Sequence, residues 1–528
     1  MKYSLSLLAG AVALGMAGSA MAYTDPDDAQ VHVVIGGASA PSNGIRETVT
    51  QTVCDSAQDI DVFVAAVDAA DSTSLHDEDW WVVQCDIDTS RFPNFVGSEK
   101  ILISKSDERG SGNGTTPIAE KIAESFLDTS DATCTSSGAD GWVDGTTSTP
   151  FVGATPYSVY TCEGATNDEA ARPLVEQIGD MGISDVEPTL FTGTLAPESG
   201  DFQTPTSGWE VESGPGLVFG VAVSLAMRDE LQADQAGTII PSSCSPGDDT
   251  LECIPSIPGA MANGLITGAI ANWTDYSPYG NDLNVPTNSP VSGTGNTATN
   301  KDRVHICRRV QGSGTHAELM VHYARTNCQA GTYEMVDAGL GGGFPPSANV
   351  YETSSSSTLG SCLAAINDNT ELTGTDPDVA AGSWSYAFGY NSTEKNASLS
   401  KNYRFVAVDG VAPSLQNAHS GDWRQTYYLS YQHRVEDFEQ GGVRTIAPND
   451  ALIEELIDDA FDLSPAIVAV LNEGFSASAG RPFDGGFLVP PSTVATPDDV
   501  FDPANPVTPW VRENLDGSPN SCQPLRLK

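Results

Sequence analysis

The sequence has few basic residues and, after its first residues, no long apolar run. Only 24 of its 528 residues are Lys or Arg, against 70 Asp or Glu, so the formal net charge is −46. Such a surface repels nucleic acid and anionic lipid, and neither is expected as a partner. No later segment approaches the roughly 18 consecutive apolar residues of a membrane helix, so no membrane insertion is expected.

Several signatures of metal or covalent chemistry are also missing. The ten cysteines form no CxxC pair and the seven histidines form no HExxH, so no metal or other cofactor is predicted. Gly110–Thr115 lacks the lysine of a P-loop, and no G-x-S-x-G elbow surrounds Ser313. The run His76–Asp79 could bind calcium or zinc, but an acidic solvated loop is the preferred interpretation.

The N-terminus has the pattern of a secretory signal peptide. Lys2 precedes the apolar stretch Leu7–Met16, and Ala20-Met21-Ala22 matches a small-x-small cleavage site. We expect residues 1–22 to be a signal peptide and the protein to be periplasmic or secreted. An oxidising compartment permits disulfides. Short separations make three pairs plausible, with connectivity left open: Cys54–Cys85, Cys134–Cys162 and Cys244–Cys253.

Short apolar runs alternate with helix-like segments along the chain, which favours an α/β architecture with largely parallel sheets. The predicted strands are Val31–Ile35, Val62–Val67, Trp81–Val83, Ile101–Ser104, Leu217–Val223, Val304–Cys307, Tyr403–Val408 and Thr426–Tyr431. The predicted helices are Thr116–Leu127, Ala170–Gly182, Gly259–Thr267, Thr315–Ala324 and Asn449–Leu456. Residues 476–528, rich in Pro and Asp, are expected to wrap the surface.

Three segments place glycines and hydroxyls between a predicted strand and a predicted helix: Gly36–Ser39, Gly110–Thr115 and Gly312–Thr315. Glycine lets the backbone approach a ligand closely, and the first turn of a helix exposes unpaired N–H groups. Together these features predict a site for a phosphate-sized oxyanion. Arg308 and Arg309 precede the third segment, and an arginine there adds two directed hydrogen bonds. A capped helix with surface arginines is the competing interpretation.

A single carboxylate, Asp185, follows the sequence Met181-Gly182-Ile183-Ser184. A carboxylate near a strand end is usually a cap or turn residue. In an oxyanion site, however, it can accept a hydrogen bond from a protonated ligand such as hydrogen phosphate. It would reject sulfate, which has no proton to give, because the carboxylate would stay unpaired.

The order of these motifs resembles the phosphate-binding proteins of ABC phosphate transporters, which are type II periplasmic solute-binding proteins. Arg309–Thr315 is similar to the family's Arg-x-Asp-Gly-Ser-Gly-Thr segment. Leu265–Asp275, which precedes it, resembles the Phe-x-Gly-x-Ile-x-x-Trp-x-Asp block. The other similar blocks are Gly36–Pro41, Gly110–Gly114, Met181–Pro188 and Val408–Ser414 with Asn417 and Ala418. Their shared order over about Val33 to Arg424 carries the resemblance.

The resemblance implies roles for seven residues, carried over by position. Arg309 would pair with the oxyanion and Asp185 would accept the proton of the ligand. The groups that would donate hydrogen bonds belong to Ser39, Ser111, Ser313, Gly314 and Thr315. Ser39 stands where the family has Thr. Gln311 replaces the acidic partner of the arginine, which would leave Arg309 less neutralised.

The resemblance also implies an α/β fold of the two-lobed periplasmic binding protein type II architecture, with long disulfide-bearing insertions. Lobe I would comprise residues 23–207 and 423–528, and lobe II residues 208–422. Hinges near Gly208 and Trp423 would let the lobes close on the ligand. The implied function is non-catalytic binding of phosphate or a similar oxyanion between the lobes, for uptake through an ABC permease. The alternative is a secreted protein of this fold that acts in adhesion, phosphate scavenging or a surface complex without a transporter. A phosphatase on a related scaffold comes third.

Overall fold

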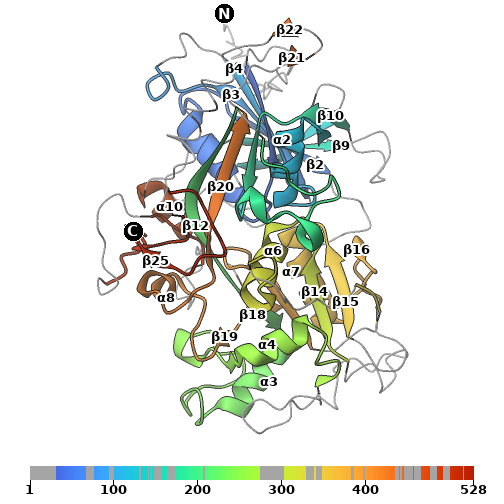
Figure 1. The fold of residues 1–528 in the computed structure, drawn as a ribbon, viewed down its shortest axis with the longest axis vertical. Coiled ribbons are helices and arrows are strands. Elements are labelled where there is room, and N and C mark those ends of the chain that lie inside the picture. Colours follow the sequence, from blue (N-terminus) through green and yellow to red (C-terminus); the bar gives the residue numbers. More distant parts are fainter. Residues whose placement is uncertain are drawn as a thin grey trace, which may run out of the picture.

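The chain folds into two α/β lobes that are joined by two long strands, β12 (Trp209–Ser224) and β20 (Thr426–Arg434) (Figure 1). The structure is a computed structural model. It describes residues 31–66, 76–93, 100–129, 133–140, 142–143, 146–147, 157–163, 173–205, 208–273, 303–328, 338–340, 348–381, 386–396, 399–434, 439–440, 443–444, 453, 456, 465–475, 485–490, 500–514 and 517–528. The predicted signal peptide and nearly all of the predicted helix Asn449–Leu456 lie outside these residues.

Lobe I is built on one half of a continuous sheet, in the order β11-β1-β4-β3-β2-β9-β6 from the crossing strands outward. The bounds are β1 Val31–Gly37, β2 Asp61–Ala66, β3 His76–Asp86, β4 Lys100–Ser106, β6 Thr133–Asp140, β9 Ser158–Glu163 and β11 Met181–Ser184. The central strand β1 is parallel to both β11 and β4. Its nearly continuous apolar sequence suits a strand that is covered on both faces.

Lobe II is built on the other half of the sheet, in the order β16-β15-β14-β17 up to β12. The bounds are β14 His305–Arg309, β15 Asn349–Thr353, β16 Thr375–Asp376 and β17 Ala387–Ser392, with β18 Tyr403–Phe405 beside β12. The strands β14, β15 and β17 run parallel, so their carboxyl ends meet at one edge. That edge faces lobe I.

Helices and short turns flank the sheet in both lobes. They are α1 Ser42–Thr48, η2 Val49–Val53, η3 Ser111–Gly114, α2 Thr116–Glu120, η5 Pro188–Leu190, η6 Gly193–Leu195, α3 Leu225–Gln235, η7 Leu251–Cys253, α4 Gly259–Ile266, α6 Gly314–Leu319, η10 Met320–Ala324, α7 Ser356–Asp368, α8 Leu415–Ser420 and α10 Pro465–Phe475. The remaining short strands are β5 Ala123–Leu127, β7 Trp142–Val143, β8 Thr146–Thr147, β10 Leu174–Ile178, β13 Ser256–Ile257, β19 Ala407–Val408, β21 Glu439–Gln440, β22 Val443–Arg444, β23 Phe487–Leu488, β24 Trp510–Val511 and β25 Arg526–Leu527.

The crossing strands connect the two halves of the sheet. The first part of β12 pairs with β20, and its last part, from Phe219 on, pairs antiparallel with β17 in lobe II. The register of β12 against β20 shifts between Ser213 and Gly216. Such an irregularity bends a strand and increases its twist, which turns the sheet of one lobe relative to the other.

Four sequence predictions about local structure are wrong. The sheet is mixed rather than largely parallel, because antiparallel strands such as β3 and β20 lie among the parallel ones. The predicted helix Thr116–Leu127 ends at Glu120, where Lys121 takes the left-handed conformation, and its second half forms β5. The predicted helix Ala170–Gly182 instead contains β10, which pairs with β5, and the start of β11. Pairing between these two segments overrides their helical propensity. His76–Asp79 begins β3 and is not a loop.

Five disulfides link the described cysteines. The three predicted pairs are confirmed. Cys307–Cys362 joins β14 to α7 within lobe II. The last pair, Cys328–Cys522, joins residues 194 positions apart.

The sequence predicted that residues 476–528 wrap the surface. The described part of this segment also contributes to the buried structure. Phe487 and Leu488 form β23, which pairs with β12 and is buried. Val511 and Arg512 are also buried. This segment is therefore part of the structure that surrounds the crossing strands.

Candidate functional site

The seven predicted site residues are all buried and gather where the two lobes meet. They follow the carboxyl ends of strands or begin helices: Ser39 after β1, Ser111 in η3, Asp185 after β11, Arg309 at the end of β14, and Ser313, Gly314 and Thr315 at the start of α6. In open α/β sheets, ligands bind outside the carboxyl ends of the strands. The two lobes bring two such edges together.

Arg309 links the two lobes through its guanidinium group. Its Nη1 donates to Ser39 Oγ in lobe I at 3.0 Å and to Ser356 Oγ at the start of α7 at 3.1 Å. Its Nε donates to Thr353 O at 3.2 Å, and its Nη2 donates to the carbonyl of Ser354. Burial lowers the pKa of Arg309 to about 10, opposed by nearby carboxylates, so the group is charged at neutral pH. The guanidinium is therefore fixed in orientation by uncharged acceptors.

Asp185 faces Arg309 from lobe I. Its Oδ2 accepts a hydrogen bond from Ser111 Oγ at 3.2 Å, while the Asp185 N–H donates to the same hydroxyl at 3.1 Å. Its Oδ1 is buried and has no hydrogen-bond partner among the described residues. Burial raises the pKa of Asp185 to about 6, although Arg309 and Ser111 act in the opposite direction. One carboxylate oxygen thus remains to accept a proton from a ligand.

The start of α6 approaches this carboxylate closely. A Cβ on Gly314 would lie 2.3 Å from Ser111 Oγ and 2.7 Å from both Cβ and Oδ2 of Asp185, so only glycine fits. The Thr315 hydroxyl is buried and has no hydrogen-bond partner among the described residues. Ser313 is the N-cap of α6, since its Oγ accepts from His316 N at 3.5 Å. For Ser313 the capping interpretation is thus correct, and its hydroxyl can still donate a proton.

Direct backbone contacts hold the two glycine-rich segments together. The Gly112 N–H of lobe I donates to Gly312 O of lobe II at 2.6 Å. Gly110 has a positive φ of 80°, and a Cβ there would lie 3.0 Å from Arg309 Nη2. Both segments therefore need glycine at the positions where the lobes touch.

Three site residues were not predicted from the sequence. Ser356 contacts Arg309 and lies 3.4 Å from Ser39, through Oγ atoms. Lys105 and Asp107, at the end of β4, form a buried ion pair. Lys105 Nζ also donates to the carbonyls of Gly37 and Ala38 at 3.2 Å, which holds the loop after β1 in position. A lysine directly after the apolar residues Ile101–Ile103 and Ser104 of the predicted strand was a signal that could have drawn attention to it.

Two further carboxylates lie behind the site, on Glu318 and Glu394. Both oxygens of Glu318 are buried and have no hydrogen-bond partner among the described residues. Burial raises the pKa of Glu318 well above its usual value and that of Glu394 to about 7, and the proximity of Asp185 adds to both increases. Both groups therefore keep a proton to higher pH than an exposed glutamate does, which reduces the repulsion of an anion. In the described part of the chain, no cluster of His, Cys, Asp or Glu could hold a metal ion.

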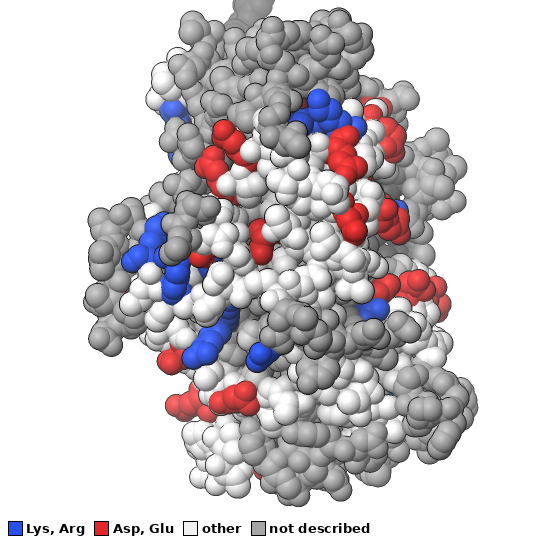
Figure 2. All heavy atoms as spheres, in the orientation of Figure 1, with Lys and Arg blue, Asp and Glu red and all other residues white. Residues whose placement is uncertain are grey.

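The sequence as a whole is strongly acidic, but most of the described surface in Figure 2 is uncharged and carries groups of both signs. Figure 2 shows separate groups of Lys and Arg among the Asp and Glu, one of them over the region of α8 and β25. None of the described helices is both long and apolar enough to cross a bilayer. The positive charge at the candidate site itself is that of the buried Arg309.

Comparisons with known proteins concern the fold only. No protein-family model matches the sequence, and no curated protein matches it. The following are three of the solved structures to which the chain is similar. A putative phosphate ABC transporter substrate-binding protein from Clostridium perfringens with bound phosphate has 10% identity and a TM-score of 0.37, covering 83% of this chain and 96% of that one. PstS from Borrelia burgdorferi has 10% identity, coverage of 84% and 97%, and a TM-score of 0.30. An ABC-type phosphate transport receptor from Vibrio cholerae has 13% identity, coverage of 56% and 79%, and a TM-score of 0.28.

The topology itself defines the fold class. Two α/β lobes, two crossing strands and facing carboxyl ends form the two-lobed architecture of type II periplasmic binding proteins.

Proposed function

We propose that the protein binds phosphate, or an oxyanion of the same shape and protonation state, between its lobes. Arg309 and Asp185 carry this proposal together. The arginine brings a positive charge whose described hydrogen bonds all go to uncharged acceptors. The carboxylate brings a buried oxygen that has no donor among the described residues. A tetrahedral oxyanion that still carries a proton satisfies both groups.

The seven predicted residues would then act as the sequence suggested. Gly314 and Thr315 would donate through the backbone at the start of α6, and the hydroxyls of Ser39, Ser111, Ser313 and Thr315 would complete the coordination. Ser356 and Lys105 are added to this set, Ser356 as a donor and Lys105 as a residue that positions the loop after β1. No covalent step is required, so the proposal is for a binding protein and not an enzyme.

We propose lobe boundaries at residues 207/208 and 422/423, where the chain enters β12 and approaches β20.

Export is supported by the five disulfides, which need an oxidising compartment. As a periplasmic or secreted receptor, the protein would deliver its ligand to an ABC permease. The alternative, a secreted binder without a transporter, is favoured by the disulfide Cys328–Cys522, because a receptor that must release its ligand gains nothing from a bond across its lobes.

Titration calorimetry with phosphate, arsenate and sulfate at neutral pH tests the proposal. We expect heat from phosphate and arsenate but not from sulfate, and loss of that heat in Arg309→Ala and Asp185→Ala. Arg308→Ala is the matched control, because the adjacent Arg308 forms an ion pair with Glu352 at 2.7 Å outside the site. Wild-type protein that gives no heat with any oxyanion would refute the assignment.

Uptake of labelled phosphate by source cells that lack the protein separates the two roles. Restoration by the wild-type protein, but not by Arg309→Ala, is expected of a transport receptor. Uptake that is unchanged by the deletion would favour the binder without a transporter.

A further inference from the structure

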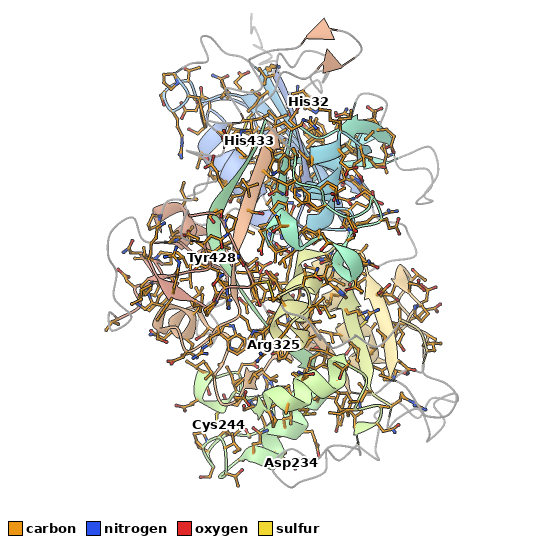
Figure 3. The ribbon with its side chains drawn as sticks, viewed as in Figure 1. His32, Asp234, Cys244, Arg325, Tyr428 and His433 are labelled. Carbon is orange, nitrogen blue, oxygen red and sulfur yellow. A yellow bond between two sulfur atoms is a disulfide. The ribbon has the colours of Figure 1, made fainter. Side chains whose placement is uncertain are left out.

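The described residues of the C-terminal segment 507–528, which are 507–514 and 517–528, pack along the second crossing strand. Arg512 Nε donates to Thr426 O at 3.1 Å, its Nη2 donates to the carbonyl of Arg424, and its guanidinium lies over the ring of Tyr427 at 4.9 Å. The neighbouring Tyr428, labelled in Figure 3, donates its hydroxyl to the carbonyl of Trp510. The segment is therefore anchored where the chain passes between the lobes (Figure 1).

The same segment is bound to lobe II at α8. Trp510 Nε1 donates to His419 O at 3.1 Å, and His419 Nδ1 lies 2.7 Å from Val507 O. These contacts attach it on the lobe II side before it turns toward lobe I.

The segment then reaches the strand end that carries Asp185. Both the N–H and the hydroxyl of Ser521 donate to Glu187 Oε2, at 2.8 and 2.6 Å. Glu187 is buried, and it lies only two residues after Asp185. Two hydrogen bonds to one buried carboxylate oxygen make a directional attachment to lobe I.

The next residue, Cys522, is covalently bound to lobe II through Cys328. Cys328 follows η10, which continues directly from α6 and therefore from Gly314 and Thr315. Beside it, Asn327 Nδ2 donates across the lobes to the carbonyls of Leu190 and Thr192, at 2.9 and 3.0 Å. The Asp185 part and the Gly314 part of the site are thus connected by hydrogen bonds and a disulfide, without any ligand.

We propose that residues 507–528 are a latch that holds the Asp185 segment of lobe I against the helix beginning at Gly314 in lobe II, with Cys328–Cys522 as its fastening. Separation of the lobes must either break the Ser521–Glu187 hydrogen bonds or pull Glu187 along with lobe II. The latch therefore favours the closed arrangement and slows ligand exchange. The part of the inference that concerns ligand exchange rests on the proposed function, whereas the closure of the lobes does not.

The double variant Cys328→Ser/Cys522→Ser tests the latch, with Cys244→Ser/Cys253→Ser as the matched control. The control removes a disulfide that spans only nine positions within lobe II. In ligand-free protein we expect the latch variant to have a larger radius of gyration by X-ray scattering. Amides of residues 181–190 should exchange hydrogen at least tenfold faster than in wild type and control. Equal scattering and equal exchange in all three proteins would overturn the proposal.

Loss of the disulfide could also loosen the whole chain, and Ser521→Ala addresses this outcome. It keeps the disulfide and removes one of the two hydrogen bonds to Glu187, so exchange of residues 181–190 should rise about threefold while amides in β14 stay protected. Faster exchange everywhere, or no change near Asp185, would contradict a latch.

Phosphate dissociation, measured by stopped-flow, is the third readout and should be about tenfold faster in the double cysteine variant. Failure of wild-type protein to bind phosphate would refute the proposed function and leave the ligand-free measurements valid. If the latch variant binds phosphate but releases it at the wild-type rate, the latch does not control ligand exchange. That outcome would leave the inference about lobe closure untouched.

Discussion

At the scale of single residues, the charge of Arg309 is balanced in an unusual way. Gln311 stands where the phosphate-binding proteins that the sequence resembles have an acidic residue. The Nε2 of Gln311 donates to Gly193 O at 3.3 Å. The hydrogen bonds of Arg309 go to two hydroxyls and two carbonyls, while Asp79, Asp185 and Asp107 act on it electrostatically. Among the described residues, no carboxylate forms a direct ion pair with this guanidinium. An anion that enters the site can therefore form one.

Asp185 is expected to make stability depend on pH. Its pKa is raised by burial from 3.8 to about 6, so the folded state binds the proton more tightly than the unfolded state. This contribution to the free energy of unfolding is fully present below about pH 4 and is lost as pH rises through about 6, a change of about 3 kcal/mol. Ligand-free Asp185→Asn should therefore be more stable than wild type at pH 8 by up to that amount, and equally stable near pH 4.

Urea denaturation of wild type and variant across pH 4 to 8 measures this difference. Asp422→Asn, at an exposed position, is the matched control for the same substitution on the surface. A difference between wild type and Asp185→Asn that stays constant over the whole range would mean that Asp185 does not titrate there.

At the scale of elements, the start of α6 sets how closely the lobes approach. Gly314→Ala adds a methyl group that would lie 2.3 Å from Ser111 Oγ, so the lobes cannot meet as they do here. We expect phosphate affinity to fall roughly a hundredfold, which is about 2.8 kcal/mol, with the fold of each lobe retained. Calorimetry gives the affinity and circular dichroism checks the fold.

Gly264→Ala on α4 is the control for this substitution. A methyl group there meets only the side chain of Ile270, which can move. Unchanged affinity in Gly314→Ala would mean that the ligand binds without this close contact between the lobes.

The sequence predicted those elements whose signal is local. Strands such as β1 and β4 contain short apolar runs, and the glycine and hydroxyl segments mark the loops after them. The two missed disulfides and Ser356 depend on contacts between distant segments, since Ser356 and Ser39 are 317 positions apart. The predicted helix Ala170–Gly182 is wrong for a related reason. Within it, Leu174–Ile178 forms β10 because β5 lies beside it.

At the scale of the whole molecule, the net charge of −46 opposes the approach of an anion. Screening shortens the range of this repulsion, because the Debye length falls from about 30 Å at 0.01 M salt to about 3 Å at 1 M. We therefore expect the association rate of phosphate to rise with NaCl concentration, whereas salt slows association with a site surrounded by basic residues. The buried contacts of Arg309 are screened much less, so the dissociation rate should change little.

Stopped-flow measurements at 10 mM to 500 mM NaCl check this expectation. Sodium sulfate cannot replace NaCl, because it introduces a possible competitor. An association rate that falls with salt would mean that a local positive field, not the net charge, governs the approach of the ligand.

The pairing of β12 with β20 has a consequence for how this chain can be rearranged. Val218 and Thr426 stand directly opposite each other in antiparallel register, at the point where the chain leaves one lobe and comes back to it. Residues opposite each other in such a pair have Cα atoms about 5 Å apart, a gap that a two-residue hairpin turn closes. Once the disulfide Cys328–Cys522 is removed, residues 219–425 therefore form a cassette with adjoining ends, which can be excised, replaced by one tight turn, or grafted onto another scaffold.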